Sequence, residues 1–196
     1  MEHAGTDSGL RAMPLTLPAW RFRALTVQGI LLISASFLLP AASHGLGLPV
    51  RWLLPMHWPV ILVGLCYGWK SGLLVGLAAP GLSFLISGRP LPVILPAMSI
   101  ELATYGLLAG FAVANLGWNR WLATVLSLVG GRVVFVATVV FLGSHVEPLG
   151  IYLQAAMLPG LVAAAVQLLS LPALAGWWHR HESLVDTSPR GRSGSE

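Results

Sequence analysis

Charged residues are scarce in this sequence. Asp, Glu, Lys and Arg make up only 9% of the 196 residues, whereas 56% are hydrophobic and the mean hydropathy is +0.78. A soluble globular protein carries about 25% charged residues, so this chain lacks the charge to cover a water-facing surface. The composition excludes a soluble domain and predicts an integral membrane protein.

Cysteine and catalytic motifs are also scarce. The single cysteine, Cys66, excludes an intrachain disulfide and any CxxC metal or redox pair. The sequence contains no GxSxG, HExxH, aspartate pair or phosphate-cradling glycine loop. His57 lies nine residues from Cys66, too far along one helix for the two side chains to touch. We expect no enzyme activity, no cofactor and no metal site, and any ATP-driven function requires another polypeptide.

Long apolar runs fill most of the chain. Breaks rich in glycine, proline or charge separate these runs, and one tilted transmembrane helix with its turn takes about 20 to 25 residues. We expect an all-α integral membrane protein with six transmembrane helices in one compact bundle. The expected spans are residues 24–42, 53–68, 71–87, 92–115, 119–142 and 151–178.

Both ends of the chain are polar. The run 24–42 is longer than the apolar region of a signal peptide, which has about 7 to 15 residues. We therefore expect it to be retained as the first span, after a cytoplasmic tail over residues 1–23. Residues 24–178 then form the transmembrane domain. The charged, Ser- and Gly-rich residues 179–196 are expected to form a disordered cytoplasmic tail.

Positive charge is unevenly distributed between the two expected membrane faces. The face with both termini has Arg11, Arg21, Arg23, Lys70, Arg120, Arg180, Arg190 and Arg192, and the other face has Arg51 and Arg89. Because cytoplasmic loops are enriched in Lys and Arg, we expect both termini in the cytoplasm and a multi-pass protein of the cell inner (cytoplasmic) membrane. The net charge of +4 thus reflects membrane topology, not nucleic-acid binding.

Glycines recur at intervals of four residues within the expected spans. They are Gly64, Gly68, Gly72 and Gly76 in the second and third spans, and Gly106 and Gly110 in the fourth. Small residues at this spacing allow helix backbones to approach closely. We expect these glycines to pack helices and to bind no ligand.

Apart from Arg120 at the start of the fifth span, two charged residues fall within expected spans, Glu101 in the fourth and Arg132 in the fifth. A charge at the centre of a bilayer costs about 2.5 to 3.5 kcal/mol on insertion scales and is a candidate for function in the bundle interior. One interpretation is a buried pair that only holds two helices in register. The other is contact with a polar solute, and both hold if a ligand inserts into an existing pair.

A second set of candidates lies near the expected external face. His57 and Trp58 open the second span, Arg89 lies in the turn after the third span, and Tyr105 follows Glu101 by one helical turn. His57 fits a ligand contact or a residue satisfied by backbone or water. Trp58 fits stacking on a flat ring or anchoring at the membrane interface.

Several short motifs follow one another along the chain. They are residues 54–60 (LPMHWPV), 64–68 (GLCYG), Gly72, Pro80, 87–90 (SGRP), 101–107 (ELATYGL), 131–133 (GRV) and 158–160 (LPG), with Gln167 and Pro172. In this order and within a six-helix frame, the motifs resemble the substrate-binding S components of energy-coupling factor (ECF) transporters, over about residues 25–178.

The resemblance implies a membrane subunit that captures a vitamin or related micronutrient near the external face. It also implies association with an ECF scaffold subunit and an ATPase pair, which energise uptake. The residues expected to bind substrate are His57, Trp58, Arg89, Glu101, Tyr105, Arg132 and Gln167. The sequence departs from the family in one respect, because no alanine-x-x-x-alanine pair, which contacts the scaffold in many S components, occurs between Ala24 and Ala42. Three explanations are open: Gly29, Ser34 and Ala35 make this contact instead, the partner is unusual, or the protein works alone.

Three alternatives stay open for the site. The protein is a structural or assembly membrane protein if the Glu101–Arg132 pair only fixes the fold. It takes up cobalamin if Cys66 or His57 provides a cobalt ligand, which thiolate and imidazole can do. Otherwise Arg132 suits a carboxylate or phosphate, Glu101 an amine or aminopyrimidine, and the aromatic residues a flat ring.

Overall fold

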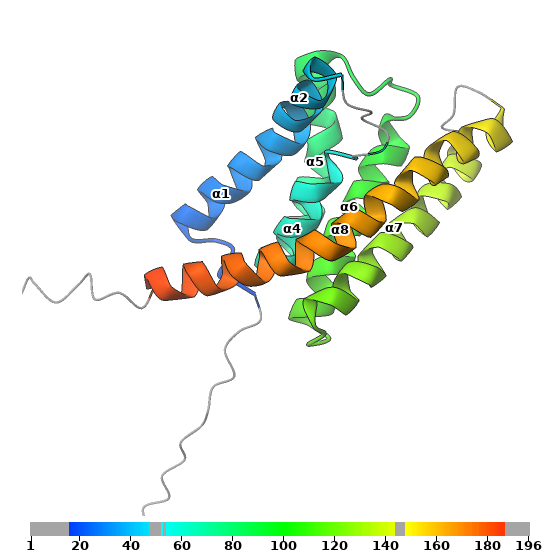
Figure 1. The fold of residues 1–196 in the computed structure, drawn as a ribbon. Coiled ribbons are helices and arrows are strands. Elements are labelled where there is room, and N and C mark those ends of the chain that lie inside the picture. The colour runs from blue at the N-terminus through cyan, green and yellow to red at the C-terminus, as the bar shows by residue number, and fades with distance from the viewer. Residues whose placement is uncertain (1–15, 48–51, 53, 144–147, 187–196) are drawn as a thin grey trace, which may run out of the picture.

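The computed structural model of the chain describes residues 16–47, 52, 54–143 and 148–186. These residues form helices and turns and contain no strand, which confirms the all-α fold. In chain order the elements are α1 (Phe22–Ile33), the π-helical segment η1 (Ser34–Leu38), α2 (Leu39–Gly45), α4 (His57–Tyr67), α5 (Trp69–Ser87), α6 (Leu95–Ala114), α7 (Arg120–Leu142) and α8 (Leu149–Asp186), as Figure 1 shows.

Five helical stretches in the described part are long and apolar enough to cross a membrane. They are Phe22–Ser43, Trp69–Ser87, Leu95–Ala114, Arg120–Leu142 and Leu149–Glu182. The expected second span, 53–68, contains only the 11-residue helix α4. At 1.5 Å per residue this helix is about 16 Å long, roughly half of the 30 Å hydrocarbon core. The expectation of six transmembrane helices is therefore not confirmed.

Helix α4 is short but lies in the centre of the protein. All of its residues except Trp58 are buried, as expected for a helix that is apolar on every side. It ends at Gly68, whose φ of +88° is a conformation that side chains disfavour. This glycine turns the chain directly into α5, so that α4 and α5 pack against each other.

Helix α6 forms the other half of the core and packs against α4, α5 and α7. A Cβ atom on Gly72 of α5 would lie 2.6 Å from the carbonyl carbon of Gly106 on α6, and one on Gly76 would lie 2.6 Å from the carbonyl carbon of Leu102. A Cβ atom on Gly64 of α4 would also meet the backbone of Gly106. The glycines therefore allow three backbones to touch, which confirms their expected role in helix packing.

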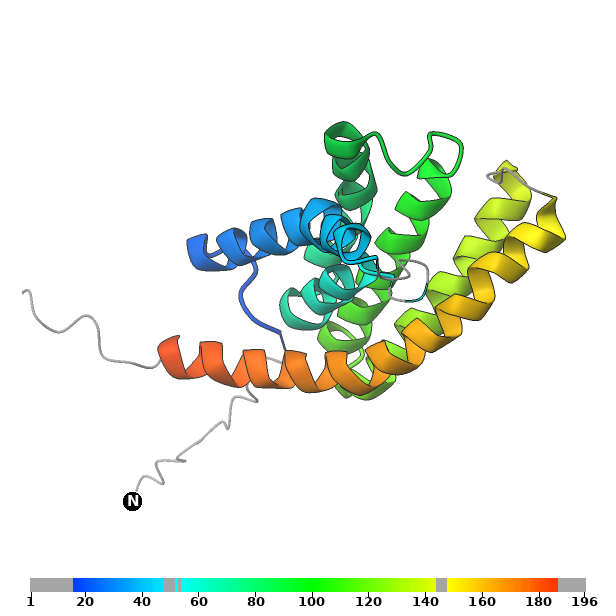
Figure 2. The same cartoon turned by 45° about the horizontal axis from the view of Figure 1, so that its top comes forward.

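The remaining helices surround this core. Helix α1 and η1 contact α4 and α5, and α8 crosses the bundle beside α7 and α4 (Figures 1 and 2). Helix α8 continues to Asp186, eight residues past the expected end of the last span at residue 178. Arg23 and Glu182 form an exposed ion pair of 3.5 Å, which places the start of α1 near the end of α8.

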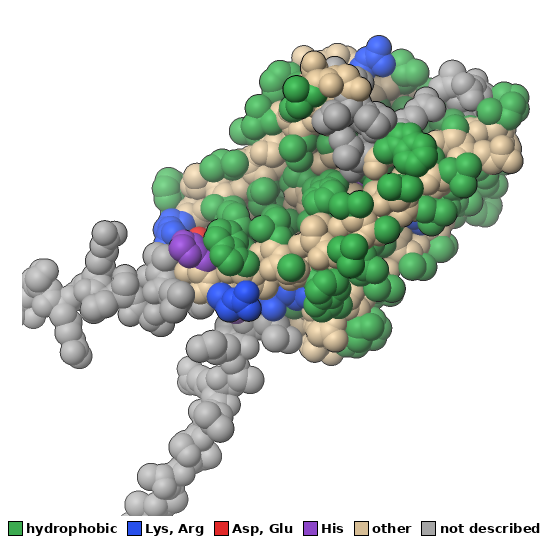
Figure 3. All heavy atoms as spheres, in the orientation of Figure 1, with side chains coloured by type: hydrophobic (Ala, Val, Ile, Leu, Met, Phe, Trp, Pro, Cys, Tyr) green, Lys and Arg blue, Asp and Glu red, His purple; other side chains and the backbone are tan. Residues whose placement is uncertain are grey.

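The outer surface of the helices is apolar. Leu85, Val129, Leu161 and Leu169 are all at least 60% exposed, and Figure 3 shows hydrophobic side chains spread over the visible face, with most Lys and Arg side chains at its two ends. Such a band of exposed apolar side chains between charged ends matches a lipid environment. Together, the apolar helices and this surface indicate a multi-pass membrane protein.

Candidate functional site

Two adjoining cavities lie at the end of the bundle where α4 begins, α5 ends and α6 begins. Their volumes are about 370 Å³ and about 290 Å³. Five residues line both cavities, namely Leu54, His57, Arg89, Pro90 and Met98. We call the larger one the polar cavity, because Glu101 and Arg132 line it, and the smaller one the apolar cavity.

Glu101 is the centre of the polar cavity's hydrogen-bond network. Its side chain is only 4% exposed, and Oε1 accepts hydrogen bonds from Arg132 Nη1 at 3.0 Å and from the Tyr105 hydroxyl at 3.2 Å. Glu101 and Tyr105 are four residues apart and lie on the same face of α6, whereas Arg132 reaches across from α7. The buried carboxylate is thus paired with a charge and a hydroxyl, as burial of a charge requires.

Two glycines and a serine make room for this network and fix its position. A Cβ atom on Gly131 of α7 would lie 2.6 Å from Cδ1 of the Tyr105 ring, so only glycine fits there. The Ser127 hydroxyl donates a 2.8 Å hydrogen bond to the backbone carbonyl of Tyr105. Gly160 of α8 lies against the Arg132 guanidinium, and a Cβ atom there would lie 2.8 Å from Cζ.

His57 is the first residue of α4 and faces the same carboxylate. Its ring packs edge-to-face on Tyr105 with a centroid distance of 5.0 Å, and its Nε2 atom lies 3.5 Å from Glu101 Oε1. The side chain is 4% exposed, and neither ring nitrogen has a hydrogen-bond partner within the described residues. His57 therefore presents unused hydrogen-bonding capacity at the junction of the two cavities.

Arg132 also has capacity to spare. Its Nη1 atom bonds Glu101, while the buried Nη2 atom has no hydrogen-bond partner among the residues that the structure describes. Its guanidinium carbon lies 5.7 Å from the centroid of the Phe135 ring, within the range of a cation–π contact. A buried N–H group without a partner lowers the stability of the protein. A solute that accepts a hydrogen bond from Nη2 would therefore bind more tightly than one that does not.

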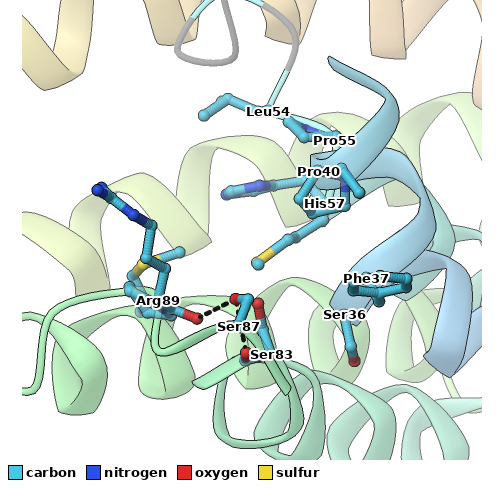
Figure 4. Close-up of a pocket in the computed structure, with 13 residues that line it drawn as sticks. Ser36, Phe37, Pro40, Leu54, Pro55, His57, Ser83, Ser87 and Arg89 are labelled. Atoms are coloured by element: carbon cyan, nitrogen blue, oxygen red, sulfur yellow. Dashed lines mark hydrogen bonds between the residues drawn. The ribbon is translucent and has the colours of Figure 1, made fainter. Parts of the chain in front are cut away.

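The apolar cavity borders the π-helical segment η1. Figure 4 shows Phe37 and Ser36 at one side of this cavity, Arg89 at the other, and the His57 ring between them. The Ser36 hydroxyl bonds the carbonyl of Leu32 on its own helix, so it is satisfied by the protein. π-helical segments are rare and occur frequently at functional sites, which agrees with the place of η1 in the cavity wall.

The structure brings together some of the expected site residues and not others. His57, Arg89, Glu101 and Arg132 line the polar cavity, and Tyr105 lies directly behind them in contact with His57 and Glu101. Trp58 and Gln167 line neither cavity, nor does Cys66. Gln167 is 1% exposed on α8, and its Nε2 atom has no hydrogen-bond partner within the described part of the chain.

Several lining residues were absent from the expected set, among them Met98, Phe135 and Tyr152. Met98 and Phe135 face the polar cavity, each three residues from a charged member of the pair, so helical periodicity alone places them on the same faces. Tyr152 also lines this cavity. No sequence signal indicates Tyr152, because its position depends on how α8 packs on α7.

The arrangement is suited to binding and release of a small polar solute. The polar cavity combines one carboxylate, two guanidinium groups and an imidazole with apolar walls, which is the usual composition of a small-molecule site. Among the residues that the structure describes, no group of three or more His, Cys, Asp or Glu side chains is placed to hold a metal ion.

Comparison with known proteins gives one match. A family model described as "ECF transporter, substrate-specific component" matches residues 23–177, which is most of the chain. No curated protein and no solved structure matches.

Proposed function

Since the chain belongs to the family of ECF transporter substrate-specific components, we propose that it is the membrane-embedded subunit that captures a vitamin or related micronutrient for uptake. The observation that supports this most is the polar cavity, where a buried ion pair with spare hydrogen-bonding capacity meets His57 and Arg89. By family such proteins bind and hand over substrates and are not enzymes.

The distribution of charge supports an orientation for this subunit. Arg23 pairs with Glu182 at one end of the bundle, and the backbone N–H of Leu17 bonds the carbonyl of Cys66 there. The cavities lie at the opposite end, beside Arg89. By the positive-inside rule, both termini lie in the cytoplasm and the cavities open to the outside of the cytoplasmic membrane.

A scaffold subunit and two ATPases complete this proposal. No nucleotide-binding motif occurs in the sequence, so the energy for release of the solute comes from other polypeptides. The outer face of α1, around Gly29, is open, because nothing lies within 4 Å of a Cβ atom built at that position. This face is available for a contact with another membrane subunit.

Native mass spectrometry of the detergent-purified protein tests the capture function. We expect a co-purified molecule of vitamin size, which is lost in the double variant Glu101→Gln/Arg132→Met while that variant remains folded. The matched control, Arg23→Met/Glu182→Gln, removes the exposed ion pair at the other end and should retain the molecule. An empty wild-type protein, after incubation with a panel of vitamins, would contradict the proposal.

A structural role for the Glu101–Arg132 pair is the second candidate, because the two side chains are bonded to each other at 3.0 Å. If the same double variant retains the molecule, the pair only holds α6 on α7. Cys66 lines neither cavity. The cobalamin alternative therefore requires His57 as the cobalt ligand.

The close contact between Gly160 and Arg132 provides a single-residue test. Gly160→Ala places a methyl group against Nη2 of the guanidinium, and because an arginine head can move, we expect the protein to fold with Nη2 displaced and the Nη1–Glu101 bond kept. Affinity for the captured solute should fall about tenfold, as for the loss of one hydrogen bond to a charged group. Gly176→Ala on the same helix, where nothing lies within 4 Å, is the control and should bind normally. Unchanged affinity in Gly160→Ala, measured by calorimetric titration, would show that Arg132 does not contact the solute.

A further inference from the structure

One oxygen of the Glu101 carboxylate, which lines the polar cavity, is already engaged by protein side chains. Glu101 Oε1 accepts from Arg132 and Tyr105, and His57 Nε2 lies 3.5 Å from the same oxygen. At this oxygen, a cationic group on a solute would compete with these three side chains. Hydrogen-bonding capacity remains at Arg132 Nη2, at the guanidinium of Arg89 and at the ring nitrogens of His57.

The charges that line the polar cavity do not cancel. Within the described part of the wall there are two arginines and one carboxylate, with His57 as the remaining titratable group. This leaves an excess of one positive charge, which belongs to the exposed Arg89 because Arg132 is paired with Glu101. A solute that carries one negative charge would neutralise it.

Geometry and charge together distinguish between a carboxylate and a phosphate as the anionic group of the solute. The planar fork of an arginine matches a carboxylate, which accepts two parallel hydrogen bonds. A phosphate monoester carries about −1.5 to −2 charges at pH 7, which exceeds the one positive charge that Arg89 adds to the pair. One excess positive charge therefore favours a carboxylate over a phosphate.

The lining of the apolar cavity indicates the polarity of the part of the solute beyond its charged group. It continues from the polar cavity past His57 and Arg89, and most of its other lining side chains are apolar, among them Phe37, Pro40 and Met56. Of its three serines, Ser36 and Ser87 each donate a hydrogen bond to the carbonyl of the residue four positions earlier. A solute that fills both cavities thus has a charged head and an apolar body.

We propose that the captured solute is a monocarboxylate, with its carboxylate bound between Arg132 and Arg89 and its uncharged, apolar body extending past His57 into the apolar cavity. This inference rests on the proposed function and specifies its substrate class. It excludes cationic vitamins and neutral ones without an acidic group as the preferred solute.

Calorimetric titration of the full chain in detergent tests the proposal with matched acid and neutral probes. The probes are biotin with biotinamide, lipoate with lipoamide, nicotinate with nicotinamide and pantothenate with panthenol, and thiamine serves as a cation. We expect at least one acid to bind about tenfold or more tightly than its neutral partner. Any molecule that co-purifies in native mass spectrometry should carry a carboxylate.

Variants at Arg89 avoid the risk that a change in the buried pair prevents folding. Arg89 is exposed, and we expect Arg89→Gln to weaken binding of the acid about tenfold while binding of the neutral partner stays the same. Arg23→Gln, an exposed arginine at the opposite end, is the matched control and should leave both affinities unchanged.

The possible results separate this inference from the proposed function. Equal binding of acid and amide, preference for thiamine, or a co-purified molecule without a carboxylate would overturn the monocarboxylate inference and leave the capture function standing. An acid preference that survives Arg89→Gln would overturn the binding mode. A protein that binds no probe and carries no molecule would overturn both.

Discussion

Replacing Gly106 with alanine is expected to prevent the bundle from folding. A Cβ atom on Gly106 would lie 2.7 Å from the Cα atom of Gly72 and still closer to that residue's carbonyl group. These are backbone atoms of a packed helix, which cannot move aside as a side chain can. Overpacking of a core costs about 1 to 3 kcal/mol and sometimes more, and we expect a loss of more than about 3 kcal/mol here.

The measurement is the yield of monodisperse protein by size-exclusion chromatography, together with the melting temperature. Gly72→Ala should be as damaging, since its Cβ atom would meet the backbone of Gly106. Gly81→Ala on α5 is the control, because nothing lies within 4 Å of a Cβ atom there, and alanine favours the helix by up to about 1 kcal/mol. A Gly106→Ala protein that melts like the wild type would contradict the packing of α5 on α6.

Replacing Arg132 with methionine is the change in the site with the largest expected effect. It leaves the carboxylate of Glu101, 4% exposed, without its charged partner. Removal of one partner from a buried ion pair costs about 3 to 5 kcal/mol, whereas replacement of both partners is often close to neutral. We therefore expect Arg132→Met to be severely destabilised and Glu101→Gln/Arg132→Met to recover most of the stability.

A double-mutant cycle on melting temperature or on unfolding free energy measures this coupling. The exposed pair Arg23–Glu182 provides the comparison, since ion pairs of this kind contribute about 0 to 1 kcal/mol. If Arg132→Met were no less stable than the double variant, the carboxylate would not depend on Arg132. The site would then be held by Tyr105 and the protein backbone.

The two terminal nitrogen atoms of the Arg132 guanidinium have different surroundings. Arg132 Nη1 neutralises Glu101, and Nη2 of the same guanidinium is left for the solute. In the proposed function, Arg132 thus both links α7 to α6 and contributes to recognition of the solute. Gly160 and Gly131 support this double role, because each leaves space for one side chain of the network.

The sequence alone was sufficient for several conclusions. Low charge and long apolar runs establish a helical membrane protein, because lipid requires apolar side chains on every outer surface. The four-residue spacing of Gly72 and Gly76, and of Gly106 and Gly110, predicts close helix contacts from local periodicity. Glu101 and Arg132 stand out because ionisable residues within apolar spans are rare.

Other features were decided only by the tertiary structure. The second expected span is a buried helix of 11 residues, because apolar residues are required equally by lipid and by a protein core, and hydropathy does not distinguish the two. Trp58 and Gln167 line neither cavity, whereas Tyr152 lines one. Whether a side chain faces a cavity depends on how α8 lies on α7, and that arrangement comes from contacts between residues far apart in the chain.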